Sequence, residues 1–197
     1  MIEHDEQVGL FKTVGKELRK KTEAYAIGGT ALMFYGIKER TKDIDLVFTD
    51  GNARRRFAEM LRQKLWYENA LRNIKMVVKN YERMEDKPLR LECHGRPNFD
   101  LFLNCLGALK FSKSMQERAI QRHDFGNFYL CIPAIEDVLL LKSMTERLTD
   151  REDAAIVIKN MKIRKEVLFG EAKKQHAETT LKEFLTEVEE QFGAKLL

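Results

Sequence analysis

The sequence predicts a mixed α/β fold, in which a mixed-sheet core is followed by a helical C-terminal part. Short apolar runs of strand length alternate with helical patterns up to Ile132-Pro133, and the pattern after that point is helical. The 197 residues contain no internal repeat and no flexible linker. We therefore expect an α/β core with an N-terminal helix over residues 1–133, and a helical part over residues 134–197 packed on it.

The first half of the predicted core alternates helices and strands. Apolar residues recur at three- and four-residue spacing over residues 4–22, which predicts a helix. Residues 25–27 form a short apolar run typical of a buried strand, and a glycine pair leads from it into a short apolar helix over residues 31–35. Residues 43–48 alternate polar and apolar before becoming wholly apolar, which predicts a central strand with carboxylates on one face. Residues 51–67 predict the next helix.

The second half of the chain predicts further strands, a hairpin and then helices. Strands are expected over residues 74–79, 89–94 and 99–104. The third is the clearest, because Asp100 is a lone acid in an otherwise apolar run. Gly126-Asn127 predicts the turn of the hairpin. The hairpin strands and the four helices are expected over residues 117–124, 127–132, 134–148, 150–160, 164–175 and 177–192.

Composition excludes several classes of protein. Hydrophobic residues make up 44% of the chain and charged residues 34%, with 3 Pro and 11 Gly, which excludes collagen-like and low-complexity sequences. No apolar run approaches the ~18 residues of a membrane helix. The acidic N-terminus has no apolar segment of the kind found in signal peptides, so we expect a cytoplasmic protein without a membrane partner. Cys93, Cys105 and Cys131 lack CxxC spacing and are expected to be reduced thiols.

The net charge of +4 is unevenly distributed along the chain. Residues 136–197 contain 11 Lys and Arg against 13 Asp and Glu, a balance of −2, which leaves +6 in residues 1–135. A basic core fits a nucleotide or nucleic-acid partner, and it equally fits a solvated surface.

The first candidate for chemistry is the segment in which a strand meets Gly28-Gly29-Thr30 and a helix follows. Two glycines allow a ligand to approach the backbone closely, and the N–H groups at the start of the following helix favour a phosphate. The alternative is a tight turn in which Thr30 caps the helix.

Three carboxylates are the second candidate. Asp43 and Asp45 lie on one face of the predicted strand, and neighbouring carboxylates repel each other unless a cation lies between them. Hard oxygen ligands of this kind suit Mg²⁺. Asp100 either joins the pair across neighbouring strands, where three carboxylates could bridge two Mg²⁺ ions, or forms a salt bridge with an arginine such as Arg96.

The order of these motifs, Gly-Gly-Thr, Asp-Ile-Asp and Phe-Asp-Leu, resembles the nucleotidyltransferase superfamily, the group related to DNA polymerase β. The resemblance covers residues 24–104 well and the rest more loosely. Within the superfamily the chain is most similar to small prokaryotic proteins of abortive-infection and toxin–antitoxin type. Residues 133–142 resemble their helix with a nucleotide-binding lysine. Residues 147–153 resemble their Arg-Asp-x-x-Asp segment, here in the altered order Asp150-Arg151.

The resemblance implies a role for each residue of the first two motifs. Gly28, Gly29 and Thr30 would hold the triphosphate through backbone N–H groups and the threonine hydroxyl. Asp43 and Asp45 would bind Mg²⁺, which would bridge the phosphates.

The resemblance also implies roles for residues later in the chain. Asp100 would hold a second metal ion and help to deprotonate the attacking hydroxyl. Lys142 would reach the phosphates, and the alternative is a side chain that extends to the surface. For Asp150 and Asp153 we instead expect, from their position at the start of the next predicted helix, that they cap it and complement its dipole.

The implied activity is Mg²⁺-dependent transfer of an NMP from an NTP to an acceptor hydroxyl, with release of pyrophosphate. A tRNA end or a protein is favoured as acceptor, and an aminoglycoside-type small molecule is an alternative. The rival hypothesis is a non-catalytic binding module of the same fold, with an antitoxin or a second copy as its partner. In an enzyme the three carboxyl groups should converge within ~4–5 Å. An Asp100 that points into the core or pairs with an arginine contradicts the enzyme hypothesis.

Overall fold

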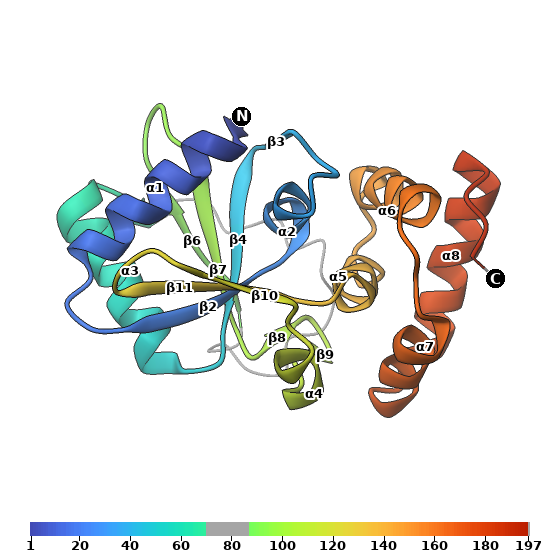
Figure 1. Cartoon of the computed structure of the whole chain (residues 1–197). Coiled ribbons are helices and arrows are strands. Elements are labelled where there is room, and N and C mark those ends of the chain that lie inside the picture. Colours follow the sequence, from blue (N-terminus) through green and yellow to red (C-terminus); the bar gives the residue numbers. More distant parts are fainter. Residues whose placement is uncertain (70–86, 197) are drawn as a thin grey trace.

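The computed structural model describes residues 1–69 and 87–196 and has a seven-stranded mixed sheet at its centre (Figure 1). The strand order is β10-β11-β2-β4-β7-β6-β5. β4 is central, antiparallel to β2 and parallel to β7, and β11 pairs in parallel with β2. The strands span Gln121–Asp124 (β10), Phe128–Ile132 (β11), Thr22–Ala26 (β2), Asp43–Phe48 (β4), Asn98–Leu103 (β7), Leu89–Glu92 (β6) and Glu68–Asn69 (β5).

Helices cover both faces of this sheet. α1 (His4–Glu17) and α3 (Gly51–Leu65) pack on one face, and α2 (Gly28–Phe34) and α5 (Ile135–Lys142) lie on the other (Figure 1). Alternation along β4 divides the core accordingly, since Ile44 belongs to the apolar cluster under α1 and α3 and Val47 to the cluster with α5. Asp43 and Asp45 therefore share the α2 side of the sheet with Val47.

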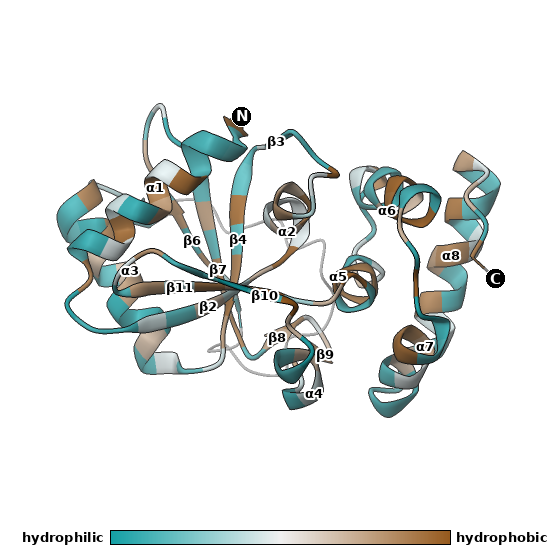
Figure 2. Ribbon diagram, viewed as in Figure 1, coloured by the Kyte–Doolittle hydropathy of each residue, from teal (hydrophilic) through white to brown (hydrophobic). Residues whose placement is uncertain are grey.

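Three further helices follow α5 and make up the rest of the helical C-terminal part. They are α6 (Leu148–Asn160), α7 (Lys165–Lys174) and α8 (Glu178–Phe192). α5 packs against α6 and α7, and α8 packs against both of these helices on the side away from the sheet (Figure 1). Figure 2 shows hydrophobic residues along β11 and on α5, which lies between the sheet and the last three helices. Burial of these residues attaches the helical part to the core.

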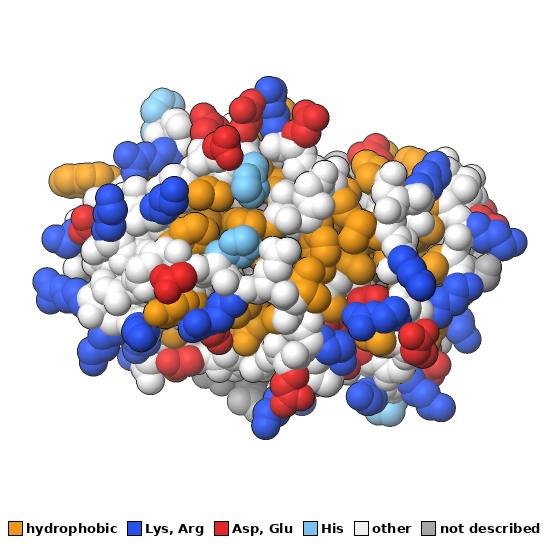
Figure 3. All heavy atoms as spheres, viewed as in Figure 1, with side chains coloured by type: hydrophobic (Ala, Val, Ile, Leu, Met, Phe, Trp, Pro, Cys, Tyr) orange, Lys and Arg blue, Asp and Glu red, His pale blue; other side chains and the backbone are white. Residues whose placement is uncertain are grey.

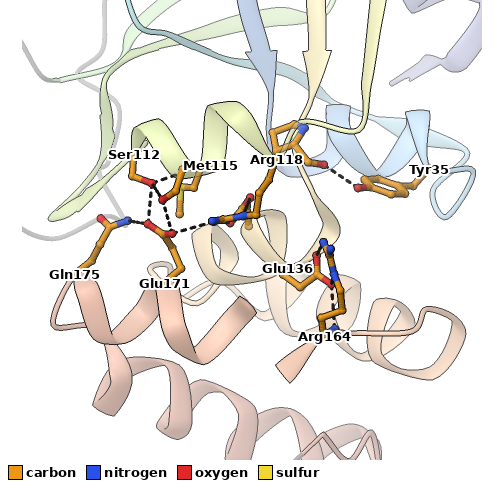
Figure 4. A network of polar contacts seen from close by, with 11 residues as sticks. Tyr35, Ser112, Met115, Arg118, Glu136, Arg164, Glu171 and Gln175 are labelled. Carbon is orange, nitrogen blue, oxygen red and sulfur yellow. Dashed lines mark hydrogen bonds and ion pairs between the residues drawn. The ribbon is translucent and has the colours of Figure 1, made fainter. Parts of the chain in front are cut away.

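A buried polar network also joins the two parts (Figure 4). The Glu171 carboxylate of α7 accepts hydrogen bonds from Ser112 Oγ at 2.7 Å, Ser114 Oγ at 2.8 Å, Gln175 Nε2 at 2.9 Å and Arg118 at 2.9 Å. Burial alone would raise the pKa of Glu171, but these donors outweigh it and lower the pKa to about 2. Arg118 also binds Asp137 of α5, so one guanidinium holds two helices.

The mixed α/β fold with a helical C-terminal part is confirmed, and the strand predicted over residues 43–48 is found at those bounds. α1 ends at Glu17 instead of extending to residue 22, and α5 ends at Lys142, because the chain turns where the sequence still shows a helical pattern. The strand predicted over residues 74–79 lies outside the described residues. The sequence analysis missed the small elements β1 (Ile2–Glu3), β3 (Arg40–Thr41), β5 (Glu68–Asn69), β8 (Cys105–Leu106), β9 (Leu109–Lys110) and α4 (Lys113–Glu117).

The three cysteines are free thiols, as predicted. In the part of the chain that the structure describes, no helix is both long and apolar enough to cross a membrane.

Candidate functional site

Two neighbouring parallel strands bring the three predicted carboxylates to one face of the sheet. β4 and β7 pair with Asp45 opposite Asp100 and with Asp43 opposite Asn98. Residues two apart in a strand share a face, so Asp43 lies beside this pair on the side that α2 covers. The three acids therefore share one face of two neighbouring strands.

Arg90 of β6 joins two of the three acids. Its guanidinium donates to Asp100 Oδ2 at 2.9 Å and to Asp43 Oδ1 at 3.0 Å, and its Nε donates to Glu92 Oε1 at 3.1 Å. Asn98 Nδ2 donates to the same Asp43 oxygen at 2.9 Å. Asp100 thus has an arginine partner, which is Arg90 and not the predicted Arg96, and such a pair contradicts the enzyme hypothesis by the criterion given above. Arg90 is 22% exposed and bridges two acids on the same face of the sheet.

Asp45 and Asp100 differ in their electrostatics, since Asp45 has no ion-pair partner among the described residues, whereas Asp100 is paired with Arg90. Burial, and next the charge of Asp100, raise the pKa of the Asp45 carboxyl well above its usual range. Burial also raises the pKa of Asp100, while the charge of Arg90 opposes the shift. Crowded carboxylates of this kind favour a proton or a cation between them.

The glycine pair forms the first turn of α2 and packs directly on the neighbouring strands. A Cβ atom at Gly28, whose φ is +55°, would lie 2.7 Å from Asp45 Oδ2, and one at Gly29 would lie 2.5 Å from Thr41 Oγ1. The buried Thr30 hydroxyl accepts the backbone N–H of Asp45 at 3.0 Å, so Thr30 ties α2 to β4 and does not cap the helix. The backbone N–H groups of this first turn have no partner within the helix.

Lys142 lies in a buried ion-pair cluster. Its side chain is 3% exposed, and its ammonium donates to Asp150 Oδ1 at 2.7 Å and to Asp153 Oδ2 at 2.8 Å. Lys38, from the connection after α2, binds Asp153 at 2.8 Å. Lys142 does not extend to the surface, and the two aspartates do not cap α6. The predicted contact of Lys142 with a nucleotide stays a prediction. To make that contact, the ammonium would have to share or leave its two carboxylate partners.

Arg147 is a residue whose position the sequence analysis did not single out. Its Nε donates to Asp150 Oδ2 at 2.8 Å, and its side chain is 53% exposed. The charge of Arg147 lowers the pKa of both Asp45 and Asp100, against the effect of burial. A basic residue at the N-terminus of a helix opposes the helix dipole, and this was the one sequence signal that Arg147 has another partner.

The donor set is compatible with Mg²⁺ in its chemistry, since Asp43, Asp45 and Asp100 offer hard carboxylate oxygens and crowd one another's charge. Within residues 1–69 and 87–196, no group of three or more acidic, histidine or cysteine side chains is gathered closely enough to hold a metal ion as it stands. The guanidinium of Arg90 lies between two of these three acids. A metal would therefore require Arg90 to move.

Comparison with models of protein families gives no match, and neither does comparison with curated proteins. Among solved structures, the chain is similar to an antigenic nucleotidyltransferase-like protein from Paracoccidioides brasiliensis. The likeness covers 98% of this chain and 93% of that one, at 15% sequence identity and a TM-score of 0.49. A similarity of this size assigns neither an activity nor a ligand to this chain.

Proposed function

We propose that this protein is a Mg²⁺-dependent nucleotidyltransferase that moves an NMP from an NTP to an acceptor hydroxyl and releases pyrophosphate. The observation that carries the proposal is the register of β4 and β7, which sets Asp45 opposite Asp100 on the face that Gly28 approaches. Crowded acids beside the first turn of a helix suit a site that holds a metal ion and a phosphate chain together. A protein that only binds a nucleotide has no evident need for three carboxylates there.

The carboxylates of Asp43, Asp45 and Asp100 would hold the metal. Bound Mg²⁺ would supply positive charge to the phosphoryl group that is transferred. The first turn of α2 would bind phosphate oxygens through the backbone N–H groups of Gly28 and Gly29, because these groups have no partner within the helix.

Asp100 and Arg147 would have separate tasks. Asp100 would accept the proton of the attacking hydroxyl, since its raised pKa makes it a better base than an exposed aspartate. Arg147 would bind phosphate oxygens, because its guanidinium is half exposed, is held by Asp150 and lowers the pKa of Asp45 by its charge. Loss of Asp100 is therefore expected to lower turnover more than nucleotide binding.

The charge of the core favours a nucleic-acid acceptor. Residues 1–135 carry a balance of +6. Figure 3 shows Lys and Arg side chains gathered over the side of the core that holds α1. Exposed basic residues on α1 and in its connection to β2 are Lys12, Lys16, Arg19, Lys20 and Lys21. We therefore propose a tRNA end as the first acceptor to test, a protein hydroxyl as the second and an aminoglycoside-type small molecule as the third.

A non-catalytic binding module is the second candidate function. It is favoured by the ion pairs of Arg90 with Asp43 and Asp100, because an arginine can neutralise these acids without a metal. Such a protein would bind an antitoxin-like partner or a second copy of itself and would not turn a nucleotide over.

Incubation with each α-labelled NTP and Mg²⁺, with and without total tRNA, separates the two candidates. We expect label to move onto RNA or protein, and we expect Asp45→Asn to abolish the transfer while keeping the shape of the side chain. Asp5→Asn is the matched control, since Asp5 is a fully exposed acid of α1.

Each outcome has a definite meaning. Transfer that is lost in Asp45→Asn and kept in Asp5→Asn supports the enzyme and identifies its acceptor class. Mg²⁺-dependent nucleotide binding without transfer to RNA or protein directs the search to small acceptors. Absence of both binding and transfer supports the non-catalytic module.

A further inference from the structure

We propose that Arg90 controls metal loading of the carboxylate site, so that the site admits a metal–nucleoside triphosphate complex readily and a bare divalent cation poorly. This inference rests on the proposed function, because it concerns the same three acids. It assigns to Arg90 a role that none of the sequence motifs contains.

The fold places Arg90 at the acids by strand register. β6 pairs with β7 so that Arg90 lies directly opposite Asp100, and β7 pairs with β4 so that Asp100 lies opposite Asp45. Side chains directly opposite each other on neighbouring strands share a face and interact. Arg90 therefore approaches the acids from an adjacent strand of the same sheet.

The contacts of Arg90 occupy the carboxylate oxygens that a metal would need. Both oxygens of Asp100 accept from Arg90, at 2.9 and 3.3 Å, and Asp43 Oδ1 accepts from Arg90 and from Asn98. Two charge-assisted hydrogen bonds of this kind are among the stronger polar contacts in proteins. A divalent cation between Asp43 and Asp100 would also meet the positive charge of the guanidinium.

Arg90 is partly exposed and has an acidic partner outside the three acids of the site. Its side chain is 22% exposed, and its Nε is already bound to Glu92, which is 49% exposed at the edge of the site. Metal loading would require the Arg90 side chain to turn outward with Glu92 and to give up Asp43 and Asp100. Among the described residues, no lysine or arginine forms an ion pair with Asp45, whereas Arg90 holds the other two acids of the site.

The two possible ligands differ in what they offer Arg90. A bare divalent cation displaces the guanidinium and gives it no new partner. A metal–triphosphate complex brings phosphate oxygens, which an arginine binds in a bidentate manner. Binding of metal and triphosphate is then coupled, and the coupling is reciprocal. Arg90 would thus make metal loading depend on the nucleotide.

Equilibrium dialysis with Mn²⁺ tests this coupling by measuring protein-bound metal directly. Each protein is dialysed against Mn²⁺ alone and against Mn²⁺ with each α,β-methylene nucleoside triphosphate. We expect the natural chain to bind Mn²⁺ about tenfold more tightly with the triphosphate than without it. We expect Arg90→Gln to bind bare Mn²⁺ about tenfold more tightly than the natural chain and to lose most of the coupling.

Two further variants separate the contact from the charge. Arg90→Lys keeps the positive charge, but a single ammonium cannot form the same two-sided bridge, so we expect an intermediate Mn²⁺ affinity. Arg96→Gln removes an arginine that donates to the Leu65 carbonyl and contacts none of the acids, so it should behave like the natural chain. Circular dichroism and thermal unfolding verify that each variant is folded. If Arg90→Gln does not fold, the comparison of Arg90→Lys with the natural chain tests the proposal.

The outcomes distinguish this inference from the proposed function. Equal affinity of the natural chain and both Arg90 variants for bare Mn²⁺, with the triphosphate complex still bound, overturns the role of Arg90 and leaves the proposed function intact. Absence of Mn²⁺–triphosphate binding in every protein overturns the proposed function and this inference with it.

Discussion

Asp45 is a carboxylate whose ionisation the fold disfavours. Burial and the charge of Asp100 raise its pKa, and its backbone is held by Thr30 while its side chain lies against Gly28. A group that keeps its proton more firmly in the folded state contributes most to stability below its unfolded pKa, and the contribution is lost as pH rises. At neutral pH, the acid at this position therefore lowers the free energy of unfolding.

Asp45→Asn should stabilise the protein because the amide carries no such penalty. We expect the free energy of unfolding to rise by about 1 kcal/mol at neutral pH and to change little near pH 4, where the unfolded acid is also half protonated. Urea denaturation of both proteins across this range measures the difference. A variant that is less stable than the natural chain at neutral pH would show that Asp45 is held by compensating contacts.

Arg147 offers a prediction about ligand affinity. Its guanidinium is half exposed and held by Asp150, and its charge acts on Asp45, so under the proposed function a bound triphosphate would reach it. We expect Arg147→Ala to weaken nucleotide binding about tenfold and Arg147→Lys to weaken it less. Arg122→Ala, which removes an exposed arginine of β10, is the matched control. Calorimetric titration with a non-hydrolysable triphosphate measures the change, and an unaltered affinity in Arg147→Ala rejects a phosphate contact.

The sequence revealed the acids at residue scale but not the arginines around them. Asp43, Asp45 and Asp100 stand out because acids in apolar strands need an explanation. Arg90 lies in an alternating strand and Arg147 in a polar stretch, where a basic residue is ordinary, and the sequence does not show which acids they contact. Their partners depend on tertiary contacts, which a local pattern does not contain.

At the scale of elements, the packing of α2 on the strands depends on the absence of a side chain. Gly29 is buried in the first turn of α2, and a Cβ there would lie 2.5 Å from Thr41 Oγ1. We expect Gly29→Ala to lower the free energy of unfolding by about 2 kcal/mol, because helix and strand must move apart. Thermal and urea denaturation measure the loss.

Two further variants verify the cause. Gly9 of α1 is exposed and has open space around it, so Gly9→Ala should stabilise the helix by about 0.5–1 kcal/mol. Combining Gly29→Ala with Thr41→Ala removes the obstructing hydroxyl and should restore part of the stability. If Gly29→Ala and Gly9→Ala have equal effects, the close contact with Thr41 does not limit the packing of α2.

Element prediction succeeded where a pattern was long or distinctive. The alternation of Asp-Ile-Asp-Leu-Val-Phe identified β4 at both ends, and Gly126-Asn127 located the turn between β10 and β11. Two-residue strands such as β1 and β3 carry no measurable pattern, because each is defined by its partner. α2 begins at Gly28 and not after Thr30, since glycine is a poor indicator of a helix start.

At the scale of the whole molecule, attachment of the helical part depends on charge as well as burial. Glu171 has a pKa lowered to about 2, below its usual 4.5, so its stabilising contribution is present above pH 4.5 and is lost as pH falls toward 2. We expect Glu171→Gln to cost about 2 kcal/mol at neutral pH and much less near pH 2. Unfolding of both proteins between pH 2 and 7 tests this.

Glu183→Gln is the control for that experiment, because Glu183 is an exposed acid of the neighbouring helix α8. Its loss should leave the pH dependence unchanged. If the free energies of unfolding of Glu171→Gln and the natural chain change in parallel from pH 2 to 7, Glu171 does not contribute to the pH dependence of stability.

The general layout of the molecule could be predicted because the change from mixed to helical patterning after Pro133 is visible in the sequence. The polar junction could not be predicted, since Ser112, Arg118, Asp137 and Glu171 are ordinary surface residues by type. Only the folded arrangement brings them together and buries Asp137 and Glu171.

The order of strands in the sheet also has a consequence for the growing chain on the ribosome. β2 is made early, yet one of its edges is completed by β11, which follows β4 and β7 in the sequence. Until Phe128–Ile132 leaves the exit tunnel, that edge of β2 has exposed backbone donors and acceptors that can pair with another nascent chain. This topology therefore requires that the open edge of β2 be kept from pairing with other chains until β11 has been synthesised.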